Sequence, residues 1–232
     1  MKWARLNVVV EGQTEETFVT EVLGRHLSGF SIAVSVRMVG HRGRQSRKYK
    51  GGLRHIAPLI EDLRRWMRED KASDACFSTM VDLYAYPSDA PGLKEACGLP
   101  PGDKVIALET ALAATVGDRR FIPYIQLHEF ETLLYSDLGK WAVQFPGRDD
   151  AIQRLKEDVA QFSDVELIND GLLTAPSKRI LKFLPEYQKV VSGSVLAIEI
   201  GITRIRNACP HFHDWVCKLE ELSQVVGVES EG

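Results

Sequence analysis

The sequence lacks long apolar runs, and this argues against a membrane span. No stretch of about 18 uncharged apolar residues occurs in the chain, although a helix needs roughly that length to cross a bilayer. The opening residues, Met1-Lys2-Trp3-Ala4-Arg5, lead directly into an apolar segment without the features of a secretory signal. We therefore expect a cytoplasmic protein that does not enter a membrane.

Cysteine is also scarce. The sequence contains four cysteines: Cys76, Cys97, Cys209 and Cys217. They are widely spread, which fits reduced thiols better than a disulfide framework. Residues 209–217 do contain two Cys and two His, but structural zinc sites use paired ligands with a longer separation. We expect Pro210 and the histidines to form a helix junction instead.

Neither sign of charge dominates. The chain has 29 Lys and Arg against 32 Asp and Glu, giving a formal net charge of −3. Any cationic surface that binds nucleic acid must therefore be local. No G-x-S-x-G motif follows a predicted strand, so a serine hydrolase has no support. The hydrophobic content of 44% and the charged content of 26% are typical of a globular protein.

The hydrophobic pattern predicts an α/β protein with a mainly parallel sheet flanked by helices. Predicted strands cover Ala4 to Val10, Ser31 to Met38, Cys76 to Leu83 and Phe121 to Leu127, with helices near 14–27, 53–67 and 103–116. Pro123 indicates an edge strand or a bulge in the fourth strand. A further helix is predicted to start just after His128, and helical patterns continue near 150–161, 177–184, 194–208 and 212–226. We therefore predict an α/β core over residues 1–140 and a helical C-terminal part over residues 141–232.

Acidic residues stand at the ends of several predicted strands or in the turns that follow. They are Glu11, Glu15, Asp82, Asp89, Glu129 and Glu131. In open α/β sheets, ligands bind beyond the carboxyl ends of the strands. Mg²⁺ prefers carboxylate oxygens, so two or three of these groups converging would hold it. The alternative is that each acid caps a helix or pairs with a surface cation, but Glu11 and Asp82 together favour a metal site.

Two segments supply candidate cations for binding phosphates. The glycine-flanked loop at 41–52 contains Arg42, Arg44, Arg47, Lys48 and Lys50 and no acid. Such a loop can track a nucleic-acid backbone, although it can equally be a solvated loop. In residues 176–179, Ser177 can cap a helix, and the next two cations, Lys178 and Arg179, can extend toward the metal site. Cations on a helix are, however, more often exposed to solvent.

Several of these segments together resemble a bacterial family of Toprim-like proteins that is known as a domain of unknown function. The main ones are Val10-Glu11-Gly12-Gln13-Thr14-Glu15, Val81-Asp82-Leu83-Tyr84-Ala85-Tyr86-Pro87-Ser88-Asp89 and His128-Glu129-Phe130-Glu131-Thr132-Leu133-Leu134. Pro176-Ser177-Lys178-Arg179 and Cys209-Pro210-His211-Phe212 are similar as well. The resemblance covers most of the chain, and it implies the metal-binding fold shared by topoisomerases, bacterial primases and OLD-type nucleases.

A Toprim-like site implies an N-terminal Glu and a D-x-D motif around Mg²⁺. Glu11 matches the first position and Asp82 the second, and the E-G-x-x-E form of the nucleases would add Glu15. The chain departs from the pattern at Tyr84, which stands two positions after Asp82. The resemblance therefore leaves the second acid open, with candidates Asp89 and Glu129.

The resemblance implies a nuclease that cleaves DNA or RNA with Mg²⁺ or Mn²⁺. We expect Glu11 and Asp82 to be the primary metal ligands, Glu15 and Asp89 to be secondary ligands, and Lys178 to stabilise the phosphate or the leaving group. The cationic loop and Arg179 would contact the nucleic acid. The resemblance also implies an ABC/SMC-type ATPase partner, in some cases in phage defence.

Two other functions remain open at this point. The first is a non-catalytic or conditionally active module that docks an ATPase partner, which the missing acid of D-x-D favours. The second is hydrolysis of a nucleotide or another small phosphoester, because the same carboxylates would serve that reaction.

Overall fold

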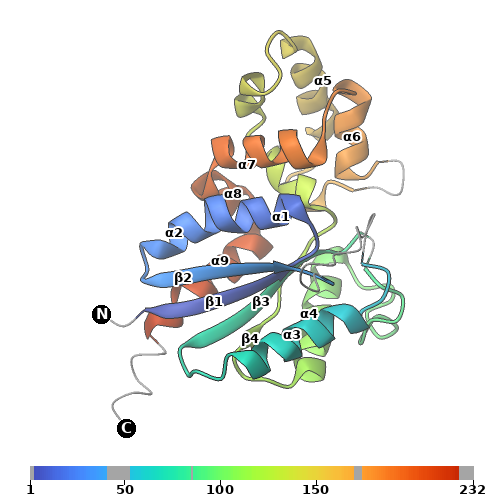
Figure 1. The fold of residues 1–232 in the computed structure, drawn as a ribbon. Helices are drawn as coiled ribbons and strands as arrows, with labels where there is room; N and C mark the ends of the chain where they lie inside the picture. The colour runs from blue at the N-terminus through green and yellow to red at the C-terminus, as the bar shows by residue number, and fades with distance from the viewer. Residues whose placement is uncertain (1–2, 41–52, 85, 170–173, 225–232) are drawn as a thin grey trace.

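The computed structural model describes residues 3–40, 53–84, 86–169 and 174–224. Its centre is a parallel sheet in the order β2-β1-β3-β4, and β5 pairs with the end of β3 (Figure 1). The strands are β1 (Ala4–Val10), β2 (Ile32–Met38), β3 (Ala75–Asp82), β4 (Phe121–Ile122) and β5 (Ile125–Gln126). The predicted α/β fold with a mainly parallel sheet is confirmed.

The β1 strand forms the middle of the sheet because its side chains are apolar on both faces. Leu6 and Val8 pack into one core cluster, whereas Val9 packs into the other. The register places Val10 opposite Met80 of β3. Because neighbouring parallel strands end at the same edge, the residues that follow β1 and β3 leave the sheet side by side.

Helices cover both faces of the sheet (Figure 1). One face carries a helix made of α1 (Gln13–Phe18), η1 (Val19–Leu23) and α2 (Gly24–Ser28), together with α9 (Pro210–Glu220). The opposite face carries α3 (Ala57–Glu69) and α4 (Pro101–Val116). The η1 segment is a π-helical turn. The apolar stripes of these helices fill the two cores.

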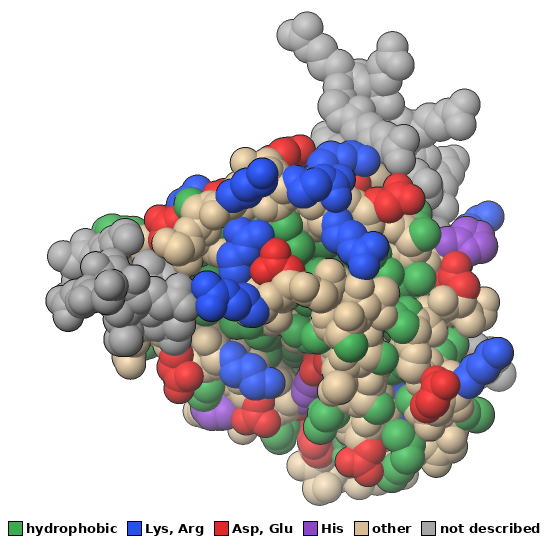
Figure 2. All heavy atoms as spheres, turned by 90° about the horizontal axis from the view of Figure 1, so that it is seen from below, with side chains coloured by type: hydrophobic (Ala, Val, Ile, Leu, Met, Phe, Trp, Pro, Cys, Tyr) green, Lys and Arg blue, Asp and Glu red, His purple; other side chains and the backbone are tan. Residues whose placement is uncertain are grey.

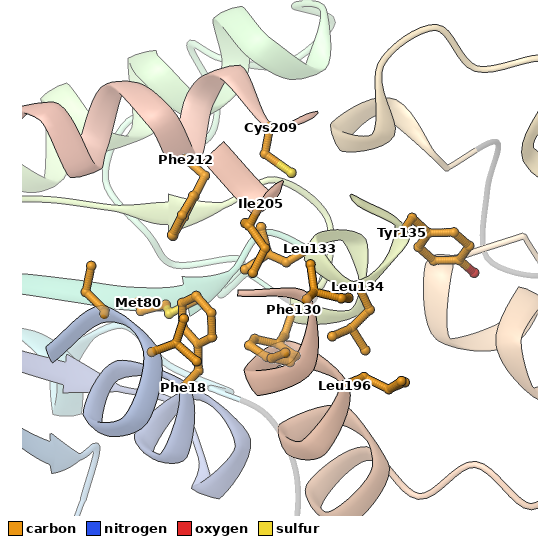
Figure 3. Packing of buried hydrophobic residues seen from close by; sticks show 14 of the residues in the cluster. Phe18, Met80, Phe130, Leu133, Leu134, Tyr135, Leu196, Ile205, Cys209 and Phe212 are labelled. Carbon is orange, nitrogen blue, oxygen red and sulfur yellow. The ribbon is translucent and has the colours of Figure 1, made fainter. Parts of the chain in front are cut away.

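The helices of the C-terminal part pack onto the α1 side of the sheet (Figure 1). They are η2 (Phe130–Val143), α5 (Asp149–Val159), η3 (Val165–Leu167), α6 (Pro176–Phe183), η4 (Lys189–Gly193), α7 (Ser194–Ile200) and α8 (Ile202–Ala208). Phe18 of α1 and Phe130 of η2 meet edge to face, with ring centroids 5.5 Å apart (Figure 3). This core joins both parts of the chain, and the predicted division at residue 140 stays a prediction.

The structure differs from the predicted elements in three places. The strand predicted over 121–127 is split between β4 and β5, because Pro123 has no N–H and the Tyr124 N–H donates to Thr79 Oγ1 instead, at 3.0 Å. The helix predicted after His128 is the 3₁₀ segment η2, which is kinked at Asp137. The helix predicted over 194–208 breaks at Gly201, whose φ of 77° ends α7.

No helix within the described ranges is long and apolar enough to cross a membrane.

Candidate functional site

Four acidic side chains converge on one lysine beyond the carboxyl ends of β1 and β3. The Nζ atom of Lys189, on η4, lies 3.3 Å from Glu15 Oε1, 3.3 Å from Asp82 Oδ2 and 3.5 Å from Glu131 Oε2. Glu11 is close enough for its charge to act on both Lys189 and Asp82. We call these four acids and Lys189 the acid cluster.

The turn after β1 places two of the four acids. The Glu11 N–H donates to the Met80 carbonyl at 3.3 Å, and Glu11 Oε2 accepts from the Asp82 N–H at 3.2 Å. Gly12 has an extended backbone and is the N-cap of α1, which carries Glu15. A Cβ atom on Gly12 would lie 3.2 Å from Glu15 Oε2, so glycine leaves room for that carboxylate.

The third and fourth acids come from β3 and η2. Asp82 is the last residue of β3, and its side chain is mostly buried. Glu131 lies in the first turn of η2 and is 1% exposed. Its Oε1 atom accepts a 3.3 Å hydrogen bond from the Tyr187 hydroxyl. Tyr187 thus orients Glu131 toward Lys189.

Buried carboxylate oxygens in the acid cluster lack hydrogen bonds. Within the described chain, Asp82 Oδ1, Glu15 Oε1 and Glu131 Oε2 are buried without a hydrogen-bond partner. The last two lie only at ion-pair distance from the Lys189 ammonium. Buried charged oxygens in this state are costly unless a cation neutralises them. The cluster therefore carries more negative charge than one ammonium balances.

The pKa values follow from burial and from this crowding. Burial raises the pKa of the Asp82 carboxyl well above its ordinary value, and the neighbouring acids raise it further against the opposing effect of Lys189. Burial likewise raises the pKa of Glu11 and of Glu131. Burial by itself lowers the pKa of Lys189, but the surrounding carboxylates outweigh it and raise that pKa above its ordinary value. Lys189 is therefore charged at neutral pH.

The donor set fits a hard divalent cation in chemistry and charge, because carboxylates are the ligands that Mg²⁺ prefers. In the arrangement seen here the ammonium of Lys189 takes the central place. Among the described residues, no three His, Cys, Asp or Glu side chains are already grouped so as to hold a metal ion. A metal would therefore require the ammonium to move aside.

A cavity of about 360 Å³ opens beside the acid cluster. Its lining includes Glu11, Glu15 and Lys189 of the acid cluster, together with Leu53 and Pro58. The cavity lies in the crevice beyond the ends of parallel strands, where α/β proteins bind ligands.

Two acids predicted as metal ligands have other partners. Asp89 is exposed; its Oδ1 accepts from the Ile56 N–H at 3.1 Å and its Oδ2 contacts His55 Nδ1 at 3.1 Å. Glu129 accepts from the N–H of Ser177 at 2.9 Å and from its hydroxyl at 3.1 Å. The two acids thus hold the starts of α3 and α6. Their roles as metal ligands stay predictions that the contacts of their side chains do not favour.

The two predicted cations that the structure describes, Lys178 and Arg179, do not pair with the acid cluster. Lys178 is exposed, and its side chain makes no ion pair with the cluster in the part of the chain that the structure describes. Arg179 is 6% exposed, forms an ion pair with Asp158 and donates to the Thr174 carbonyl at 2.9 Å. The loop with Arg42, Arg44, Arg47, Lys48 and Lys50 lies outside the described residues.

Cationic side chains elsewhere on the described surface are mixed with acids. Figure 2 shows Lys and Arg gathered over part of the face seen from below, with Asp and Glu among and around them. Several arginines of the described chain are in ion pairs, such as Arg37 with Glu69 and Arg120 with Asp118. This mixture agrees with the small net charge of −3.

The segment with two Cys and two His forms a helix junction, as predicted. Pro210 is the first residue of α9, directly after α8 and Cys209. The buried Cys209 contacts Ser136, whereas His211 contacts Glu109 at 3.0 Å on another side.

Two members of the acid cluster were not predicted as site residues. Lys189 lies in a segment of mixed polar and apolar residues, distant in the sequence from every predicted strand, and no local pattern marks it. Glu131 was recognised as an acid near a strand end, but Glu129 was preferred as the ligand. The available signal was the pair of acids two positions apart in one segment, and it did not distinguish which of them points inward.

Residues 10–220 match the family described as "Domain of unknown function (DUF4276)". Comparison with curated proteins gave no match. Among solved structures, the C-terminal region of the Xanthomonas campestris pv. campestris OLD protein aligns with 15% identity and a TM-score of 0.40, covering 99% of this chain and 100% of that one. The C-terminal region of the Burkholderia pseudomallei OLD protein aligns with 17% identity and a TM-score of 0.41, covering 97% and 99%.

Proposed function

We propose that this chain, which belongs to the DUF4276 family, is a Toprim-like, Mg²⁺- or Mn²⁺-dependent phosphodiesterase that cleaves DNA or RNA. The observation that carries the proposal is the acid cluster. Carboxylates from α1, β3 and η2 lie within 3.5 Å of the Lys189 ammonium, Glu11 accepts from the neighbouring Asp82 N–H, and buried oxygens in the cluster lack hydrogen bonds. A site with this excess of buried negative charge attracts a divalent cation.

Glu11, Glu15, Asp82 and Glu131 would hold the metal. When bound, the metal would activate water and neutralise charge that develops on the phosphate. Glu131 takes the place of the acid that Tyr84 leaves missing, because its carboxylate faces Asp82 across Lys189. Tyr187 keeps Glu131 in this orientation through its hydroxyl.

Lys189 takes the role that the sequence suggested for Lys178. Its side chain is 41% exposed, so the ammonium can leave the carboxylates when a metal enters and still remain at the mouth of the site. There it would pair with a phosphate oxygen of the substrate. The position of the ammonium beside the carboxylates supports this assignment.

A cleavage assay tests the proposal. The wild type is incubated with Mg²⁺ or Mn²⁺ and single-stranded DNA, duplex DNA or RNA, beside Glu11→Gln, Asp82→Asn and the control Asp89→Asn. We expect cleavage by the wild type and by Asp89→Asn, and losses of at least about a hundredfold in the two cluster variants. Equal cleavage by all four proteins would show that the activity does not come from this site.

A second function is favoured by Lys189 itself. Because its ammonium already stands where a metal would bind, the chain can be a module that is inactive until a partner moves η4. The expected partner is an ABC/SMC-type ATPase encoded in a neighbouring gene, as in phage defence. Co-purification with that ATPase, together with cleavage only by the complex, would select the conditionally active form; co-purification without cleavage would select a docking role.

A further inference from the structure

The cavity beside the acid cluster has walls that the metal chemistry does not use. Four of its lining residues are aliphatic: Val39, Leu53, Pro58 and Val190. Metal ligands need only the carboxylate wall. The aliphatic side chains therefore present a surface for a flat, largely apolar part of a ligand.

The size of the cavity sets what can enter. A volume of about 360 Å³ lies at the small end of the range for ligand pockets, about 300–1,000 Å³. It can hold one nucleoside but not a stack of paired bases. A base can enter such a pocket only when it has left the helical stack, and apolar side chains commonly hold a base in that state.

Polar groups at the rim match the rest of a nucleotide. Gln13 is exposed at the start of α1 and lines the cavity, so its amide can exchange hydrogen bonds with the edge of a base. Arg54 is also exposed and lines the cavity, so it can contact a phosphate that flanks the base. The acid cluster at the inner wall is the place for the scissile phosphate.

We propose that this cavity binds a single unpaired nucleoside next to the phosphodiester at the acid cluster. The inference rests on the proposed phosphodiesterase function and narrows its substrate to single-stranded DNA or RNA, or to frayed ends. Duplex nucleic acid is excluded until a nucleotide unstacks, because a cavity of about 360 Å³ does not hold stacked, paired bases.

Equilibrium binding tests the proposal without requiring catalysis. The full chain is titrated in Ca²⁺ with a labelled single strand of about 12 nucleotides, its duplex, and the same sugar–phosphate backbone without bases. Unlabelled nucleoside monophosphate serves as a competitor. Val190→Trp, on η4, and Gln13→Trp, on α1, fill the cavity from two separate elements, and Ile198→Trp is the control, since Ile198 is 43% exposed on α7 and does not line the cavity.

We expect the wild type and Ile198→Trp to bind the single strand at least ten times more tightly than the duplex or the baseless backbone. Both cavity-filling variants should lose that preference and bind the single strand like the baseless backbone. Competition by the monophosphate would show that the cavity accepts a free nucleotide as well as a nucleoside within a strand. This result would also support the proposed nucleoside pocket.

The result that overturns the inference is equal affinity for single strand, duplex and baseless backbone, or unchanged base preference in both cavity-filling variants. Mn²⁺ titration of the same proteins separates this failure from failure of the proposed function. Suppose that Mn²⁺ binds and that Glu11→Gln abolishes cleavage, but that the single strand and the baseless backbone bind with equal affinity. Only the nucleoside pocket is then refuted. If Glu11→Gln cleaves like the wild type, the phosphodiesterase site itself is refuted.

Discussion

The Nζ atom of Lys189 lies 3.3 Å from Oδ2 of Asp82, although 107 positions separate the two residues in the sequence. This contact ties η4, in the C-terminal part, to the end of a central strand of the sheet. It also gives the acid cluster a cation that belongs to the protein itself. Whatever binds at the carboxylates has to compete with that ammonium.

Removing the ammonium should increase metal affinity. In Lys189→Met the four carboxylates keep their positions but lose the competing charge, so we expect Mn²⁺ to bind about tenfold more tightly, or about 1.4 kcal/mol. Isothermal titration calorimetry measures this directly. Lys178→Met is the matched control, since Lys178 is exposed and lies outside the acid cluster. Weaker Mn²⁺ binding in Lys189→Met would show that the lysine supports the metal rather than competing with it.

The same variant should change how stability depends on pH. The folded-state pKa values of Asp82, Glu11 and Glu131 are raised, so the folded protein binds more protons than the unfolded chain and stability falls as pH rises through this range. Without Lys189 these pKa values rise further. Lys189→Met should therefore reduce the free energy of unfolding little near pH 4.5 and by roughly 1–3 kcal/mol near pH 8. This loss is smaller than that for breaking a fully buried ion pair, because the Lys189 side chain is 41% exposed.

Chemical denaturation at a series of pH values, without metal, checks this expectation. A loss of stability that stays constant from acid to neutral pH would contradict the charge argument, because packing alone would then account for it.

The identity of the fourth acid can be decided by a pair of isosteric variants. Glu131→Gln should lower Mn²⁺ affinity by about 10- to 100-fold, since it removes a ligand charge at the centre of the site. Glu129→Gln should leave Mn²⁺ affinity within about twofold and instead weaken the start of α6, where Glu129 holds Ser177. The opposite order of the two affinities would restore Glu129 as the ligand.

A separate pH effect is expected at Glu166. This residue is 1% exposed and accepts hydrogen bonds from the N–H groups of His211 at 2.7 Å and Phe212 at 3.1 Å. Burial raises its pKa from 4.5 to about 7, against the opposing effects of those two N–H groups and of His211. The associated stability is fully present below pH 4.5 and is lost as pH rises toward 7, on the order of a few kcal/mol.

Glu166→Gln should remove most of this slope between pH 5 and pH 8. A smaller slope of the same sign should remain, because the hydrogen bond and the charge of Glu109 still act to raise the pKa of His211 against its burial. Glu95→Gln, at an exposed acid, is the control and should behave like the wild type. An unchanged slope in Glu166→Gln would mean that Glu166 is already ionised when folded.

Gly193 should not tolerate a methyl group. A Cβ atom there would lie 2.9 Å from the hydroxyl oxygen of Tyr187, which is buried and bonded to Glu131. We expect Gly193→Ala to cost about 1–3 kcal/mol of unfolding free energy. The cost should shrink in a Tyr187→Phe background, where no hydroxyl is in the way. Gly102→Ala, with nothing within 4 Å of its Cβ, should be neutral or stabilising.

The elements of the fold could be predicted because each depends on a local pattern. The apolar run from Leu6 to Val10 is long enough for a buried strand, and the Gly-Gln-Thr-Glu-Glu segment after it begins a helix. The same pattern placed Glu11 and Asp82 at strand ends. The break between β4 and β5 could be predicted because Pro123 has no N–H to donate within a strand. The kink of η2 at Asp137 had no comparable signal in the sequence.

The sequence by itself determined the α/β class, the succession of strands and helices along the core, and the two acids at the ends of β1 and β3, Glu11 and Asp82. Only the tertiary structure decided that Lys189 and Glu131, rather than Lys178 and Glu129, point into the cluster. The reason is physical: local periodicity sets which residues form a strand or helix, but side chains from η2 and η4 meet only when both segments pack over the same sheet edge. The cavity that we assign to a nucleoside exists for the same reason.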